Sequence, residues 1–66
     1  MVRNKLKEIR MKEYMLNQKE FAEKLDIAQG QFNRYEKELA VPTLEVALKI
    51  AYKLNKDVKD IFCLVE

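Results

Sequence analysis

Apolar residues recur every three or four positions along most of this chain, the spacing that gathers side chains on one face of an α-helix. The pattern is sharpest in residues 17–36, where two short amphipathic segments meet at a tight break, Asp26-Ile27. In the first segment, about residues 18–25, three positions are predicted to face a core: Phe21, Ala22 and Leu25. Two short helices joined by a turn are therefore expected here.

The second segment, residues 29–36, separates its side chains onto two faces. At about 100° per residue, Phe32 and Tyr35 point to one side. The opposing arc carries four polar or small residues: Gln29, Gly30, Asn33 and Arg34. One face suits a hydrophobic core, and the other suits hydrogen bonding to the edges of DNA bases. The pattern therefore predicts a recognition helix.

Capping residues mark where these two helices begin and where the chain turns. Asn17 can accept a hydrogen bond from the backbone N–H of Glu20, and the Glu20 side chain can reach back to Asn17, which forms a capping box. Asp26 stands where a left-handed backbone is often needed, and Asp tolerates it better than most residues. Ile27 is expected to fill the angle between the helices.

Further helices are predicted on both sides of this region. Asn4 is expected to cap a first helix that runs to about Glu13 or Tyr14. Pro42 stops any preceding helix, and Thr43 is the predicted N-cap of the next one. That helix is expected to bury an apolar stripe: Leu44, Ala47, Leu48, Ala51 and Leu54.

The last residues predict a short fifth helix and an extended tail. Asn55 suits a left-handed C-terminal cap, and Asp57 suits the N-cap of a helix with Asp60 three residues on. The apolar tail from Phe62 to Val65 lacks a helical continuation, and an exposed strand of that kind requires a partner. The predicted fold class is all-α, a single five-helix domain over residues 1–66, to which a terminal β-strand pair can be added.

Composition narrows the class of protein. The 66 residues are 48% hydrophobic and 36% charged, with a formal net charge of +2. No apolar run approaches the roughly 18 residues of a transmembrane span, and the first ten residues do not resemble a signal peptide, so a cytoplasmic protein is expected. Six basic and two acidic residues lie in residues 1–19, whereas the remainder is net acidic. Such asymmetry suits a protein that meets phosphates with one side, although charged helix faces are commonly just solvated.

Missing residue types argue against catalysis. The chain has no histidine or serine and one cysteine, so no His/Cys metal cluster and no Ser-His or Cys-His nucleophile pair is available. A single glycine excludes a phosphate-binding Gly-rich loop. We expect no enzyme activity, no cofactor and no metal. Cys63 is interpreted as a small apolar residue of the tail.

The spacing of several residues resembles the lambda-repressor/Cro type of helix-turn-helix regulators, in particular the small members of bacteria and phages. The resemblance covers about residues 4–62, with the helix-turn-helix itself at about 18–36. It rests on these residues: Gln18, Phe21, Ala22, Leu25, Ile27, Phe32, Tyr35, Glu36, Pro42, Thr43, Leu44, Leu48, Ile50, Ala51, Leu54, Asp60, Ile61 and Phe62. It implies double-stranded DNA as partner, with residues 29–36 in the major groove.

The resemblance also implies roles for individual residues. Those expected to face bases are Gln29, Gly30, Asn33 and Arg34. Asn17, Gln18 and Thr43 match positions that contact phosphates, and Gln18 would also brace the first recognition residue. Free N–H groups and a positive dipole end at helix N-termini give the phosphate contacts a physical reason.

Four positions depart from the family pattern. Asp26 and Glu38 stand where the family usually has Gly, and Ala28 removes the usual Ser or Thr cap of the third helix. The family often has an Arg seven residues before the Gln, paired with the Glu after the Tyr; here Met11 holds that place and Arg10 precedes it. An Arg10–Glu36 ion pair is therefore expected only if the connection is one residue longer.

Base readout has a competing interpretation. Gln29 and Asn33 can each bond adenine N6/N7, and Arg34 can bond guanine O6/N7, each with roughly 1–3 kcal/mol of discrimination. Alternatively these are solvated polar residues, and Arg34 pairs with Glu38 at i+4.

One recognition helix reads only a few base pairs, so a homodimer on a palindrome is expected, acting as a repressor. The predicted dimer surface consists of Ile61, Phe62, Cys63, Leu64 and Val65, with Met1–Arg3 as an added strand. The alternative function is a protein-binding module, such as an antitoxin that masks a partner protein.

Overall fold

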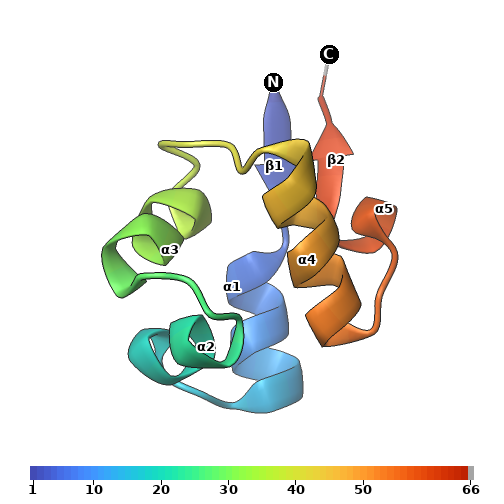
Figure 1. Cartoon of the computed structure of the whole chain (residues 1–66). Coiled ribbons are helices and arrows are strands. Elements are labelled where there is room, and N and C mark those ends of the chain that lie inside the picture. The colour runs from blue at the N-terminus through green and yellow to red at the C-terminus, as the bar shows by residue number, and fades with distance from the viewer. Residues whose placement is uncertain (66) are drawn as a thin grey trace.

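The computed structural model describes residues 1–65 and contains five α-helices, one π-helical turn and two short strands within that range (Figure 1). In chain order these are β1 (Val2–Asn4), α1 (Leu6–Ile9), η1 (Arg10–Tyr14), α2 (Gln18–Lys24), α3 (Gln29–Glu36), α4 (Leu44–Leu54), α5 (Val58–Ile61) and β2 (Phe62–Leu64). The all-α class and the predicted strand pair are confirmed.

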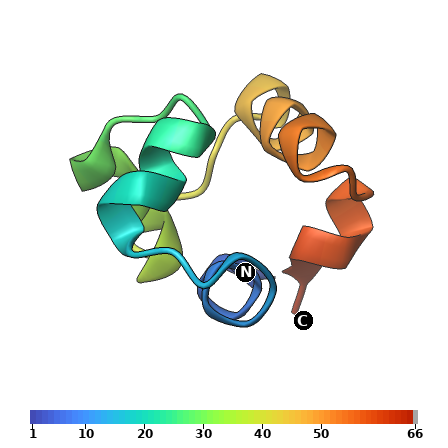
Figure 2. The ribbon, with the colours of Figure 1, turned by 90° about the horizontal axis from the view of Figure 1, so that it is seen from below.

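The helices surround one core (Figure 2). Seen from below, α1 with η1, the α2–α3 pair, α4 and α5 follow one another around it. The buried apolar side chains that form the core are Leu6, Ile9, Phe21, Ala22, Leu25, Phe32, Tyr35, Ile50, Ala51, Leu54 and Ile61. Phe21 and Phe32 meet edge to face with ring centroids 5.5 Å apart, a favourable arrangement for aromatic rings. This contact joins α2 to α3 inside the core.

The buried face of α4 differs in part from the predicted stripe. Ala47, Ala51 and Leu54 are buried as expected, but Leu44 and Leu48 are 73% and 52% exposed. Ile50 fills the core instead and is 1% exposed. Apolar residues occupy two neighbouring faces of this helix, so periodicity alone cannot tell which face meets the core.

Local capping follows the sequence closely. Asn17 and Glu20 form the predicted capping box, with Glu20 N donating to Asn17 Oδ1 at 2.8 Å. Thr43 caps α4, since its Oγ1 accepts from Val46 N at 3.3 Å. Asp26 and Asn55 adopt the expected left-handed backbone, with φ of 58° and 55°. These short-range predictions are confirmed.

The two ends of the chain pair with each other. β1 and β2 are antiparallel, with Val2 opposite Leu64 and Asn4 opposite Phe62. Asn4 lies in β1, and Lys5 occupies the N-cap position of α1 where Asn4 was predicted. The Asn4 side chain still accepts from Leu6 N at 3.0 Å, and its Nδ2 donates to the Tyr35 carbonyl at 2.8 Å. Asn4 therefore ties the strand pair to the end of α3.

The first helix ends in a π-helical turn, Arg10–Tyr14. Its C-cap residue Met15 has a left-handed backbone with φ of 52°, and Leu16 N donates to the Arg10 carbonyl at 3.4 Å. A π turn holds one more residue than an α turn at the same point of a helix. No helix in the described part of the chain is long and apolar enough to cross a membrane.

Candidate nucleic-acid interface

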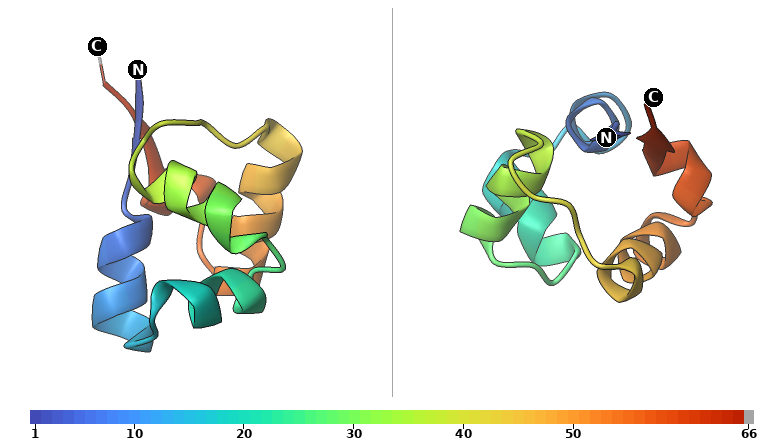
Figure 3. Two further views of the ribbon diagram at one scale, coloured as in Figure 1. Left: turned by 90° about the vertical axis from the view of Figure 1, so that its left-hand side faces the viewer. Right: turned by 90° about the horizontal axis from the view of Figure 1, so that it is seen from above.

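Helix α3 is the outermost element on one side of the molecule. Viewed from that side, it lies across the front, with α2 below it and the first turn of α4 above it (Figure 3, left). Phe32 and Tyr35 hold it to the core and are 0% and 6% exposed. Ala28 precedes it without a side-chain cap, as expected from the sequence. Helix α3 therefore depends on its two buried aromatic anchors for its position.

The structure brings the predicted base-facing residues together on the outer surface of α3. Gln29, Gly30 and Arg34 are exposed, and Asn33 is half-buried. Apart from its own helix backbone and its two chain neighbours, no atom lies within 4 Å of the place where a Cβ on Gly30 would stand, so the surface around it is open. The four residues form one polar face with no apolar side chain among them.

A chain of polar contacts links the first helix to this face. Arg10 Nε donates to Glu36 Oε2 at 2.8 Å, and Arg10 Nη1 donates to the Leu16 carbonyl at 3.0 Å. Glu36 Oε1 accepts from Gln18 Nε2 at 3.1 Å. The same nitrogen of Gln18 donates to Asn33 Oδ1 at 3.0 Å. Side chains from η1, α2 and α3 therefore hold one another in place.

The π turn explains why the Arg10–Glu36 pair forms. The sequence has Arg10 one residue earlier than the family pattern, and the pair was expected only with a longer connection. Helix residues normally advance about 100° each, so one extra residue would turn Arg10 away from α3. The π turn takes up that residue, and the Arg10 and Glu36 side chains are 13% and 5% exposed. The π turn therefore supplies the longer connection that the Arg10–Glu36 pair was expected to need.

Chemistry fixes the direction of each hydrogen bond in this chain of contacts. A guanidinium only donates and an ionised carboxylate only accepts, so Gln18 has to present its NH₂ group to Glu36. The second proton of that group goes to Asn33, which has to accept through Oδ1. The NH₂ group of the Asn33 amide, Nδ2, is then directed away from Gln18. The family resemblance implied that Gln18 braces the first recognition residue, whereas in the structure its side chain bonds to Asn33.

The predicted phosphate-contacting residues lie at helix N-termini. Asn17 and Thr43 are exposed caps of α2 and α4, and Gln18 is the first residue of α2. Helix N-termini carry unpaired backbone N–H groups and a partial positive charge. Both protons of the Gln18 NH₂ group are already donated within the protein. The group that Gln18 offers to an anion is therefore its backbone N–H.

Arg34 does not form the predicted alternative salt bridge. Within residues 1–65 it makes no ion pair, and Glu38 instead lies 3.7 Å from Arg3 Nε. The Arg34 side chain is exposed. This removes the main structural competitor for a contact with DNA.

The basic excess of residues 1–19 is in part neutralised within the protein. Three of its side chains engage carboxylates: Arg3 with Glu38, Arg10 with Glu36 and Lys12 with Glu8. The positive charge available to DNA on α3 comes from Arg34, outside that segment.

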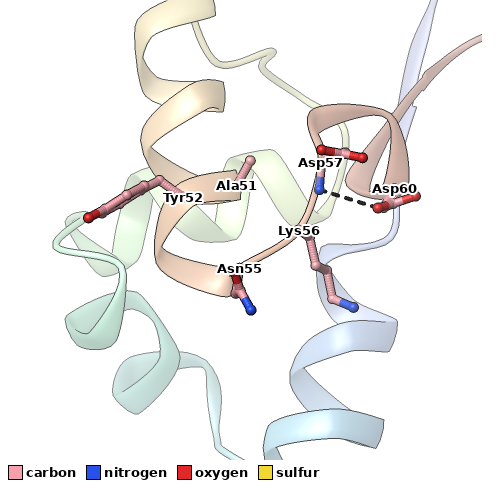
Figure 4. Close-up of a pocket in the computed structure, with 6 residues that line it drawn as sticks. All are labelled: Ala51, Tyr52, Asn55, Lys56, Asp57 and Asp60. Atoms are coloured by element: carbon pink, nitrogen blue, oxygen red, sulfur yellow. Dashed lines mark hydrogen bonds between the residues drawn. The ribbon is translucent and has the colours of Figure 1, made fainter.

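A shallow hollow at the α4–α5 corner is lined by Ala51, Tyr52, Asn55, Lys56, Asp57 and Asp60 (Figure 4). Asp57 N donates to Asp60 Oδ2 at 3.2 Å, and Lys56 pairs with Glu13 at 3.0 Å, so these groups hold the corner together. Across residues 1–65, no group of three or more His, Cys, Asp or Glu residues is placed to hold a metal ion.

Two short helices joined at a turn, the second carrying an exposed polar face, define a helix-turn-helix DNA-binding domain. The model of the helix-turn-helix family matches residues 6–61, which is most of the chain. The chain belongs to this family, in its lambda-repressor/Cro-like form, and is a DNA-binding transcriptional regulator. A search of curated proteins finds no match to it.

Proposed function

We propose that this protein is a repressor that binds a palindromic operator as a homodimer, with α3 in the major groove. The observation that carries the proposal is the braced polar face of α3. Base-reading side chains have to be held in place to discriminate, and the Arg10–Glu36–Gln18–Asn33 contacts supply that support without DNA.

Asn33, Gln29 and Arg34 are the proposed base-reading side chains. Asn33 keeps Nδ2 as a donor and one lone pair of Oδ1 as an acceptor, which suits adenine N7 and N6. Because Gln18 holds Oδ1, the order of donor and acceptor along the groove is set before DNA arrives. Gln29 has the same chemistry without that support, and Arg34 suits guanine O6 and N7. Gly30 lets the DNA approach the helix closely.

Phosphate contacts fix the register of α3 on the duplex and carry no direct sequence information. The proposed contacts are the exposed N-termini of α2 and α4. Asn17 and the backbone N–H of Gln18 belong to the first, and the hydroxyl of Thr43 belongs to the second. Since Thr43 Oγ1 accepts from Val46 N, its hydroxyl proton is available to a phosphate oxygen.

A homodimer gives the proposal its specificity. Two recognition helices about 34 Å apart read two half-sites on one face of DNA. The C-terminal tail offers less of a dimer surface than its sequence predicted. Ile61 is buried in the protomer's own core at 1% exposed, and Phe62 is half-buried against the same core. Only Cys63, Leu64 and Val65 remain exposed.

The decisive experiment is selection of bound sites from random double-stranded DNA. The expected result is a symmetric sequence with two half-sites spaced by about one helical turn, bound far more tightly than random DNA and less tightly as salt rises. Failure to enrich any sequence, at low as well as physiological salt, would sink the proposal and favour a protein-binding role. Such a regulator acts where the DNA is, and we propose the cytoplasm of a bacterium.

A further inference from the structure

Helix α4 carries an apolar stripe that the protein leaves in contact with solvent. Leu44, Leu48 and Tyr52 lie at i, i+4 and i+8, so their side chains align along one side of the helix. Their exposed fractions are 73%, 52% and 87%. In Figure 4 the Tyr52 side chain extends from α4 to the side opposite Asp57 and Asp60. Single exposed apolar residues are ordinary, but three aligned on one helix suggest a docking surface.

This surface is separate from the two regions already described. In the left panel of Figure 3, α3 faces the viewer, the paired chain ends lie at the left, and α4 lies at the right. The stripe also lies outside the core face of α4, which consists of Ala47, Ile50, Ala51 and Leu54. Neither DNA contact nor strand pairing accounts for it.

We propose that a second copy of this chain covers the stripe, with the two α4 helices packed antiparallel across a two-fold axis. The inference rests on the proposed homodimer and assigns its interface. An axis through Leu48 places Leu44 of each protomer against Tyr52 of the other. The Leu44–Tyr52 contact then occurs twice, once at each end of the stripe, as a two-fold interface requires.

Charges beside the stripe complement each other in this arrangement. Glu45 and Lys49 border it and form an i, i+4 pair at 3.3 Å, with side chains 79% and 67% exposed. An α-helix rises about 1.5 Å per residue. In antiparallel packing about Leu48, Glu45 and the partner's Lys49 are therefore offset by only about 3 Å along the direction of the helices. Parallel packing would put like charges at the same level. The charge order therefore favours the antiparallel pair.

The position of α4 also suits DNA binding. In Figure 1, α3 lies at the left and α4 lies in front of α1. A two-fold axis running from left to right in front of α4 carries the second copy to the front. Its α3 then faces left as well, toward the same side of one duplex.

Sedimentation equilibrium with two matched substitutions tests the proposal. Leu48→Glu puts a charge in the stripe, and Leu64→Glu puts the same charge at an exposed position of the tail, 69% exposed. The expected result is a dimer for the unmodified chain and for Leu64→Glu, and a monomer for Leu48→Glu. Both substituted side chains are exposed in the protomer, so helical circular dichroism should stay unchanged. Tyr52→Glu is a second route to the same monomer.

Charge reversal supplies an independent arm. Glu45→Lys alone should weaken the dimer, and adding Lys49→Glu should restore it, because the double variant regains opposite charges across the axis. Dimeric Leu48→Glu and Tyr52→Glu together with monomeric Leu64→Glu would overturn the proposal in favour of the tail. An unmodified chain that is monomeric at high micromolar concentration would overturn it as well.

DNA binding separates this inference from the proposed function. Monomeric Leu48→Glu should lose about 100-fold or more in affinity for the selected palindrome, while keeping its base preference on a single half-site. If the unmodified chain selects a DNA sequence but Leu48→Glu remains dimeric, the interface assignment fails and the repressor function stands. If the chain dimerises through α4 but prefers no DNA sequence, the repressor function fails.

Discussion

Arg10 Nε lies 2.8 Å from Glu36 Oε2, although the sequence places Arg10 one residue away from the family's position. The π-helical turn that begins at Arg10 makes the contact possible. Through Gln18, the pair also sets the orientation of Asn33 on the outer face of α3. The irregular turn in the first helix therefore affects the orientation of a side chain on the proposed DNA-binding surface.

Replacing Arg10 by Met should destabilise the protein by about 3 kcal/mol, because it leaves the nearly buried Glu36 carboxylate without its ionic partner. Chemical denaturation measures the change. Lys12→Met is the matched control, since Lys12 pairs with Glu8 on the surface, where ion pairs contribute about 0–1 kcal/mol. Equal effects of the two substitutions would show that the Arg10–Glu36 pair is no stronger than a surface pair.

Two exposed methionines, one inside the π turn and one directly after it, give a test of backbone strain. Met15 has φ of 52° and is 82% exposed, so Met15→Gly should stabilise the protein by about 0.5–1 kcal/mol. Met11 lies inside the turn and is 55% exposed, and Met11→Gly should destabilise the protein by about 1 kcal/mol. Thermal unfolding of the pair should show opposite signs. Destabilisation by both substitutions would argue against a left-handed Met15.

Gln18→Leu should relax base preference at the position that Asn33 reads, because it removes the bond that orients the Asn33 amide. Preference at positions read by Gln29 and Arg34 should change little. Selection from random DNA, run in parallel with Gln31→Ala as an exposed control on α3, measures this. An unchanged Asn33 position in Gln18→Leu would mean that the contact does not orient the reading side chain.

Arg34→Ala and Thr43→Ala should affect DNA binding differently. Arg34→Ala should cost about 1–3 kcal/mol on the preferred site and much less on sequences altered at the base it reads. Thr43→Ala should weaken all sequences alike, and it should also destabilise the fold by about 1 kcal/mol through loss of the α4 cap. Binding measured on the selected site and on single-base variants separates the two. Equal losses on every sequence from Arg34→Ala would make Arg34 a phosphate contact.

Short-range features of this protein were accessible from the sequence because neighbouring residues decide them. The bounds predicted for α3, 29–36, are those of the structure. The Asn17–Glu20 capping box, the Thr43 cap and the left-handed Asp26 also need only residues a few positions apart. The core anchors Phe21, Ala22, Leu25, Phe32 and Tyr35 follow from helical spacing within one element.

Longer-range features depended on contacts that no local pattern contains. The buried face of α4 was predicted only in part, because a helix with two apolar faces is oriented by what packs against it. Leu44 and Leu48 were expected in the core and are exposed, whereas Ile50 is buried. The Arg10–Glu36 pair joins residues 26 positions apart, so no local pattern contains it. Gln18 braces Asn33 because those side chains approach only after α2 and α3 have packed.

The sequence by itself thus determined where most of the helices lie, the caps at Asn17 and Thr43 and the polar face of α3, since these arise from backbone chemistry and the 3.6-residue period. Only the tertiary structure decided how the extra residue of the first helix is absorbed and which amide of α3 is held. It also decided which apolar side chains remain outside the core. Those outcomes depend on packing between helices and strands. A side chain can have several chemically equivalent partners in the sequence, and the packing decides which of them lies close enough for contact.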